Sequence, residues 1–126
     1  MKQALNLSLI VAVALFSVHE MDAMTHAEWR LLPILSGMQE DAARGTFVLL
    51  HIPIYIGVFW ALFVASWKQL AGRIFSFAVF AHAAAHFLLS DHNLYTFNAP
   101  IETITVYGAA LASLIYLGLS FKGVSE

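Results

Sequence analysis

The 126-residue sequence contains no cysteine and little charge. Without thiols it has no disulfide bonds, thiolate metal sites, iron–sulfur clusters or cysteine nucleophile. Charged residues make up 11% of the chain, whereas roughly a quarter is usual in soluble proteins. The six Lys and Arg residues are outnumbered by eight Asp and Glu, which argues against a nucleic-acid-binding protein. With 60% hydrophobic residues, the composition also excludes a disordered chain and a coiled coil.

Four long apolar stretches are what the sequence has in abundance. They cover residues 5–18, 46–66, 71–89 and 101–121. A helix that crosses a bilayer needs about 20 mostly apolar residues, and the last three stretches meet that length. The first meets it only if the helix continues through His19, Glu20 and Asp22. We therefore predict an all-α fold: a single four-span transmembrane domain over residues 1–126, built as an integral membrane up-down four-helix bundle. The connection at 23–45 has room for a short interfacial helix.

The start of the chain also fits a second interpretation. Lys2 followed by an apolar stretch resembles a cleavable signal peptide. The residues after that stretch, His19-Glu20-Met21-Asp22, do not form a small-x-small cleavage pattern. We therefore expect the segment to remain as the first helix.

Basic residues in short loops predict the orientation of such a bundle. Four of the six fall on the side of the two termini: Lys2, Lys68, Arg73 and Lys122. The other side carries Arg30 and Arg44, which neighbouring acidic residues offset. This bias predicts a multi-pass membrane protein with both termini cytoplasmic, and the family resemblance given below implies the bacterial cytoplasmic (inner) membrane.

Ionisable side chains gather at one depth of the expected bundle. Each of the four helices places at least one of them near its outer end: His19, Asp22, His51, His82, His86 and Glu102. At a rise of 1.5 Å per residue, all six lie within roughly 12 Å of the outer interface. An ionisable group inside a membrane costs several kcal/mol unless it is satisfied. This shared layer therefore indicates a functional polar site.

The spacing of these residues favours a metal site. His82 and His86 stand at i and i+4, the spacing with which one helix offers two imidazole nitrogens to one ion. His19 and Asp22 share a helical face at i and i+3. Imidazoles combined with carboxylates suit a divalent transition metal, with zinc or iron most favoured. The predicted ligands are His19, Asp22, His82 and His86.

Two further residues are predicted to be catalytic. Glu20 points about 100° away from His19 on the same helix, which favours a general base over a ligand. His51 is either a fourth ligand or an acid–base group. Glu102 is the weakest member of the layer.

Less specific interpretations stand beside this one. A single intramembrane histidine is more often a packing residue than a ligand. His26 and His92 fall at or beyond helix ends and are expected at the interface, and Glu28 with Arg30 fits a surface ion pair of little energetic value.

Haem b is the alternative cofactor. His51 with His82 or His86 could bind its iron axially, but the carboxylates would then have no role. A third alternative is a non-catalytic accessory subunit of a larger membrane complex.

The ordered motifs resemble an uncharacterised family of small bacterial four-span membrane proteins. The resemblance rests on four motifs: His19-Glu20-Met21-Asp22-Ala23, Glu28-Trp29-Arg30, His51-Ile52-Pro53 and His82-x-x-x-His86. It implies the four-span architecture and the choice of site residues, but no reaction. Other membrane families with a similar N-terminal histidine–acidic motif are suspected enzymes.

Taken together, the sequence predicts a metal-dependent membrane hydrolase or oxidase. The expected substrate is a lipid or another amphipathic molecule that reaches the site from the bilayer. A homo-oligomer or a larger membrane complex is compatible with this prediction, whereas nucleic acid is not an expected partner.

Overall fold

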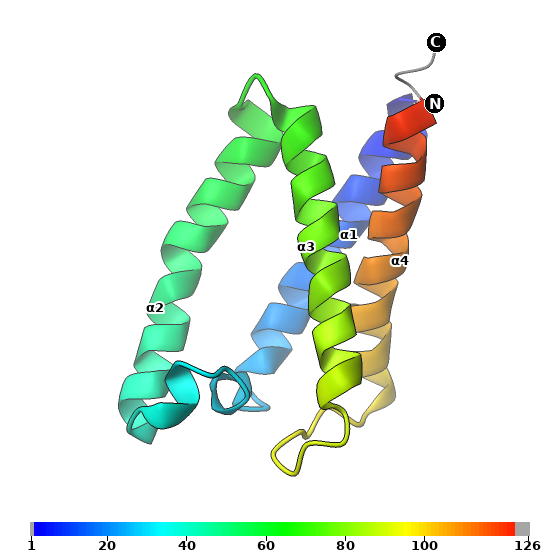
Figure 1. The fold of residues 1–126 in the computed structure, drawn as a ribbon. Helices are drawn as coiled ribbons and strands as arrows, with labels where there is room; N and C mark the ends of the chain where they lie inside the picture. The colour runs from blue at the N-terminus through cyan, green and yellow to red at the C-terminus, as the bar shows by residue number, and fades with distance from the viewer. Residues whose placement is uncertain (1, 123–126) are drawn as a thin grey trace.

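Four long helices make up most of the protein in the computed structural model, which describes residues 2–122 (Figure 1). They are α1 (Lys2–Ala23), α2 (Glu40–Phe59), α3 (Lys68–Leu89) and α4 (Pro100–Lys122). α2 continues through a π-helical turn, η3 (Trp60–Val64). The described residues contain no β-strand, and all four helices are long and apolar enough to span a membrane. The predicted all-α four-helix bundle is confirmed.

The helix ends differ in places from the predicted stretches. α1 extends beyond the apolar run and includes His19, Glu20 and Asp22, so it reaches spanning length. α2 begins at Glu40 rather than at residue 46, because Glu40 and Asp41 suit the positive end of a helix dipole. Apolarity alone therefore underestimated both helices.

α4 is the central helix of the packing. In an 18-residue apolar stretch of α4, half of the residues are buried, whereas only 11% are buried in the corresponding stretch of α2 and η3. Its small inward residues, Ala109, Ala112 and Ser113, are buried and let α1 and α3 approach closely. α2 stands apart from the other three helices along most of its length (Figure 1). The bundle thus combines a tight three-helix unit with one outlying helix.

Two short 3-10 turns, rather than one interfacial helix, connect α1 to α2. They are η1 (Glu28–Arg30) and η2 (Leu35–Gly37). A small buried cluster fixes this connection, and it consists of Ala23, Trp29, Leu35, Ala43, Phe47 and Phe97. The connection is therefore part of the packed structure.

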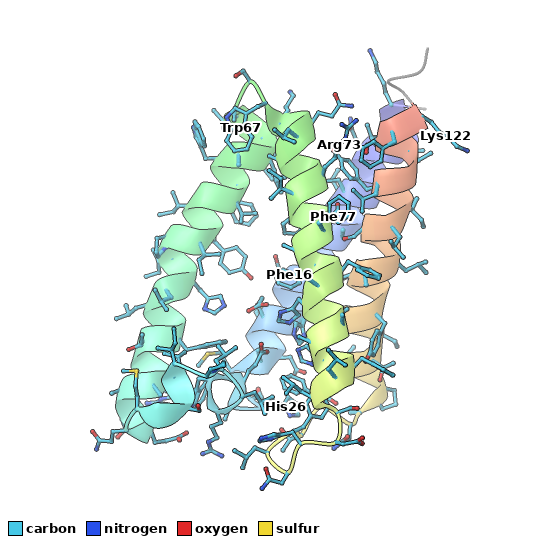
Figure 2. All side chains as sticks on the ribbon, viewed as in Figure 1. Phe16, His26, Trp67, Arg73, Phe77 and Lys122 are labelled. Carbon is cyan, nitrogen blue, oxygen red and sulfur yellow. The ribbon has the colours of Figure 1, made fainter. Side chains whose placement is uncertain are left out.

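The two ends of the bundle differ in chemistry. Both ends of the described chain and the α2–α3 hairpin lie at one end, and the two longer connections lie at the other (Figure 1). At the terminal end, the Arg73 guanidinium donates to the Ser120 carbonyl (2.7 Å) and lies over the Phe121 ring (Figure 2). Near the opposite end lie His19 of α1 and His82 and His86 of α3.

Close packing of α3 against α4 generates a first prediction. A Cβ atom on Gly72 would lie 2.7 Å from Cζ of Tyr116, whose side chain is 3% exposed and has little room to shift. We expect Gly72→Ala to lower the free energy of unfolding by about 1–3 kcal/mol, the usual cost of overpacking. The measurement is thermal or denaturant unfolding of the purified protein in detergent.

Gly118→Ala is the matched control. A Cβ atom there meets nothing within 4 Å, and alanine is the better helix former, so this variant should be as stable as the wild type or more so. Equal stability of the two variants would contradict the α3–α4 packing described here.

Candidate metal centre

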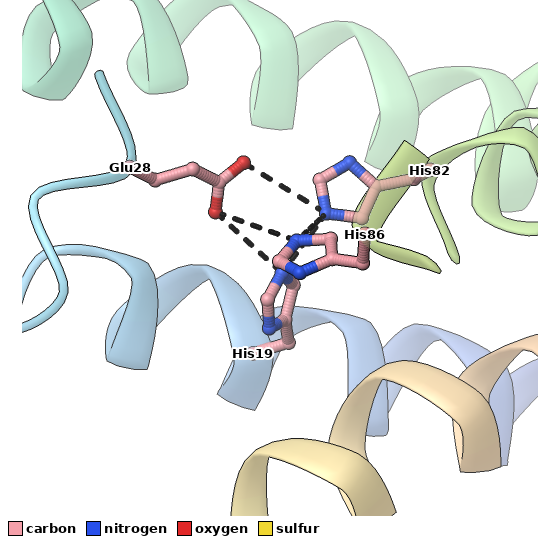
Figure 3. A group of neighbouring side chains, drawn as sticks. All are labelled: His19, Glu28, His82 and His86. Carbon is pink, nitrogen blue, oxygen red and sulfur yellow. Dashed lines mark hydrogen bonds and ion pairs between the residues drawn. The ribbon is translucent and has the colours of Figure 1, made fainter. Parts of the chain in front are cut away.

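Four side chains from three separate segments meet at the end of the bundle opposite the termini (Figure 3). His19 comes from α1, His82 and His86 from α3, and Glu28 from η1. His19 is fully buried, while His86 and Glu28 are 4% and 6% exposed. The His82 side chain is 25% exposed and forms the more open side of the group.

The facing atoms of this group have the spacing of metal ligands. The Nε2 atom of His82 lies 2.9 Å from Nε2 of His19 and 3.1 Å from Nε2 of His86. The Glu28 carboxylate oxygens lie 3.6–3.9 Å from the three nitrogens. Ligands about 2.0–2.1 Å from a tetrahedral ion stand about 3.3–3.4 Å apart. Four donors therefore surround one point at nearly the right distance.

Hydrogen bonds alone leave this group incompletely satisfied. Nε2 of His82 makes two short contacts, one with Nε2 of His19 and one with Nε2 of His86. If Nε2 of His82 carries a proton, that proton can form only one of these two hydrogen bonds. Within residues 2–122, Oε2 of Glu28 and Nδ1 of His19 have no hydrogen-bond partner although both atoms are buried. Unpaired polar atoms in a protein interior are costly, and a cation at the shared point would satisfy the carboxylate and all three Nε2 lone pairs.

The surrounding structure orients the ligands. Nδ1 of His86 lies 3.0 Å from the Tyr95 hydroxyl. A proton on that nitrogen, donated to Tyr95, leaves Nε2 free to face the centre, as is usual for a metal-bound histidine. The three positions between His82 and His86 are alanine, and Ala83 is buried against Val106 and Ala110 of α4, so the small side chain lets α4 pack closely beside the histidines.

Glu28 reaches the centre because the chain turns sharply just before it. Ala27 adopts the left-handed conformation (φ 51°, ψ 46°), which costs an L-residue about 1–2 kcal/mol. After this turn the Glu28 carboxylate faces the histidines of α1 and α3. Strained backbone of this kind is found preferentially at functional sites.

The prediction of a surface ion pair between Glu28 and Arg30 is therefore wrong. Arg30 instead binds the exposed carboxylate of Glu40 through Nε and Nη2, at 2.9–3.2 Å. The Trp29 indole N–H donates to the same carboxylate (3.0 Å). Glu28 is thereby left to face the histidines.

Burial dominates the protonation of Glu28. Removal from water, together with the nearby negative charge of Glu20, raises the pKa of Glu28 from its ordinary 4.5 to about 8. The carboxyl thus resists ionisation unless a cation is close.

Asp22, a predicted ligand, lies in a different group. It forms a second cluster with His26 and Glu102, in which the three facing atoms lie within 4.8 Å of one another. His26 is therefore part of a polar cluster rather than a free interfacial residue. His92 lies on the exposed loop, where its Nδ1 accepts the Leu94 amide.

Glu20 and His51, the two predicted catalytic residues, form a direct pair. Nε2 of His51 lies 2.7 Å from Oε2 of Glu20, and Nδ1 lies 2.6 Å from the Phe47 carbonyl oxygen. A carbonyl can only accept, so Nδ1 carries a proton, and the Nε2–Oε2 contact requires another. The pair therefore holds a shared proton, and neither residue belongs to the four-residue group.

Cavities adjoin this pair on two sides. One of about 180 Å3 is bordered by the pair and by apolar residues of α1, α2 and α3, among them Phe16 and Phe75. Another, of about 170 Å3, borders the pair, Met21 and Met24. Phe16 lines the first cavity and also packs edge-on against His82 (ring centroids 5.2 Å apart), so one ring contacts both the cavity and the four-residue group.

Comparisons with known proteins assign no activity to the chain. The model of a family of unknown function matches residues 5–123, nearly the whole chain. No curated protein and no solved structure matches the sequence. The function must therefore be argued from the geometry.

The raised pKa of Glu28 generates a second prediction. Between about pH 4.5 and pH 8 the folded protein binds a proton that the unfolded chain has lost, so metal-free stability falls as pH rises through this window. Glu28→Gln removes that proton uptake. We expect chelator-treated Glu28→Gln to melt at a higher temperature than the wild type, with a larger difference at about pH 8 than at about pH 5.

Glu40→Gln is the control, since its carboxylate belongs to the exposed pair with Arg30. It should change the melting temperature little at either pH. A Glu28→Gln protein whose advantage shrinks as pH rises would show that this carboxyl is not held protonated by burial.

Proposed function

The chain belongs to DUF6713, a family of unknown function, and we propose that it is a metal-dependent membrane enzyme whose metal site is the group of His19, Glu28, His82 and His86. The observation that carries the proposal is the convergence of three Nε2 atoms and a buried carboxylate, with short contacts that hydrogen bonds cannot all satisfy. In this proposal Glu28 is the carboxylate ligand instead of the predicted Asp22.

The donor set favours zinc or iron. Three imidazoles and one carboxylate are borderline ligands, and both metals accept them in sites with an open position. Haem is less well supported, because the Nε2 atoms lie only 2.9–3.1 Å apart and a porphyrin plane would have to pass between them. His51, the other axial candidate, is engaged by Glu20.

The bound ion would supply a Lewis acid that polarises a substrate oxygen or activates water. The protein's own contribution to proton transfer is the Glu20–His51 pair. The Phe47 carbonyl fixes the orientation of the imidazole, and the short Nε2–Oε2 contact lets the pair accept or release its shared proton. Hydrolysis and oxidation both use such a pair.

A lipid or another amphipathic molecule is the substrate class that fits. The cavity beside Glu20 and His51 is lined otherwise almost wholly by apolar side chains, so it suits a hydrocarbon chain whose polar end meets the pair. Four helices that are long and apolar enough to span a membrane support a substrate drawn from the bilayer. The excess of basic residues at the terminal end supports an orientation with cytoplasmic termini, and we place the protein in the bacterial inner membrane as part of this proposal.

Metal analysis tests the proposal directly. We expect His82→Ala to lose one equivalent of zinc or iron relative to the wild type, measured by elemental analysis of protein purified in mild detergent. His92→Ala, which removes an exposed loop histidine, should keep the wild-type content. A wild type without stoichiometric metal, or a content unchanged by His82→Ala, would contradict the proposal, and a Soret band would favour the haem alternative.

The Glu20–His51 pair gives a separate prediction. Because neither residue belongs to the ligand group, Glu20→Gln and His51→Gln should retain the wild-type metal content, whereas His86→Ala should lose one equivalent. Loss of metal in His51→Gln would make this histidine a ligand. The same samples, compared by circular dichroism, show whether each variant is folded.

A further inference from the structure

We propose that Asp22, His26 and Glu102 form a second, independent site for a divalent cation. The three residues come from the last turn of α1, the segment after it and the first turn of α4. Their facing atoms, one imidazole nitrogen and two carboxylate oxygens, lie within 4.8 Å of one another. Nε2 of His26 is 2.7 Å from Oε1 of Glu102 and 3.6 Å from Oδ2 of Asp22.

The hydrogen bonds around His26 leave a lone pair facing the carboxylates. Its Nδ1 lies 2.9 Å from Oγ1 of Thr96, and that hydroxyl donates to the His26 carbonyl at 3.5 Å. With its own proton used in this way, Thr96 accepts from Nδ1–H. In the neutral imidazole Nε2 then has a lone pair, so the 2.7 Å contact with Oε1 of Glu102 is bridged either by a proton or by a bound cation.

The two carboxylates are also placed for an ion. Oε2 of Glu102 accepts the Ala99 backbone N–H, which turns Oε1 toward His26. Within the described part of the chain, Oδ2 of Asp22 is buried without a hydrogen-bond partner. Two carboxylates held this close repel each other, and a divalent cation offsets both charges. Three protein ligands leave positions for water, and the partly exposed His26 and Asp22 side chains give the ion access.

This second site is separate from the first. The Phe97 ring lies 4.5 Å from the ring of His26 and 5.7 Å from that of His19, so it packs against a residue of each group. No side chain supplies ligands to both groups among residues 2–122. The inference therefore stands independently of the proposed function.

A structural role follows from the elements that the second ion would join. Asp22 and Glu102 connect the end of α1 to the start of α4, and these helices share the largest contact in the bundle. His19 is one turn before Asp22 on α1. An ion here would fix the end of α1 from which His19 projects.

Cation counting tests the site with Zn²⁺ and Co²⁺ as probes. Metal-free wild type, reloaded in detergent and desalted, should bind two equivalents. Asp22→Asn, which preserves shape, and Glu102→Gln, which keeps an acceptor for Ala99, should each bind one equivalent or bind the second at least about tenfold more weakly. Asp91→Asn, an exposed loop carboxylate, should still bind two.

The outcomes separate this site from the first. His82→Ala should retain the equivalent that Asp22→Asn loses, and the double variant should bind none. A wild type that binds one equivalent, lost in His82→Ala and kept in Asp22→Asn, would overturn the inference: the second group would then hold a proton. One equivalent lost in Asp22→Asn and kept in His82→Ala would support the second site while refuting the first.

Discussion

The structure depends on a single constraint: ionisable side chains at one end of an apolar bundle must satisfy one another or a bound cation. His19, His86 and Glu28 are almost completely buried there, and the contacts among them leave Oε2 of Glu28 and Nδ1 of His19 without a hydrogen-bond partner. The convergence of Glu28 on the histidines explains why the chain after α1 turns back through the strained Ala27. The polar centre and the local fold are thus consequences of the same requirement.

The bundle divides the chemistry between two parts. The tight unit of α1, α3 and α4 carries the three histidines of the proposed metal site, which requires fixed positions, and η1 adds Glu28. The outlying α2 contributes His51, which meets Glu20 of α1 at the edge of an apolar cavity. The three-helix unit and the outlying α2 are therefore the two parts that the proposed enzyme would use, the first for its ion and the second for an amphipathic substrate.

The sequence predicts the bundle well because apolar length and helical spacing are local properties. The depth of His19, His82 and His86 follows from their distance to the helix ends, and the structure brings these three together. Glu28 could not be found in this way, because it lies outside the helices and its position depends on the turn at Ala27. Helical spacing predicts that Asp22 lies beside His19 in one site. In the structure α4 packs against α1, and Asp22 lies near Glu102 of α4 instead. Contacts between helices decide such assignments, and a helical repeat within one segment does not encode them.

The central claim is that one ion binds between His19, Glu28, His82 and His86. Anomalous diffraction from crystals of the purified protein, recorded on both sides of the absorption edge of the bound metal, tests it most directly. We expect an anomalous peak about 2 Å from the three Nε2 atoms and from a carboxylate oxygen of Glu28. Fully occupied, ordered side chains with no peak at that position, in a protein supplied with zinc and iron, would contradict the account.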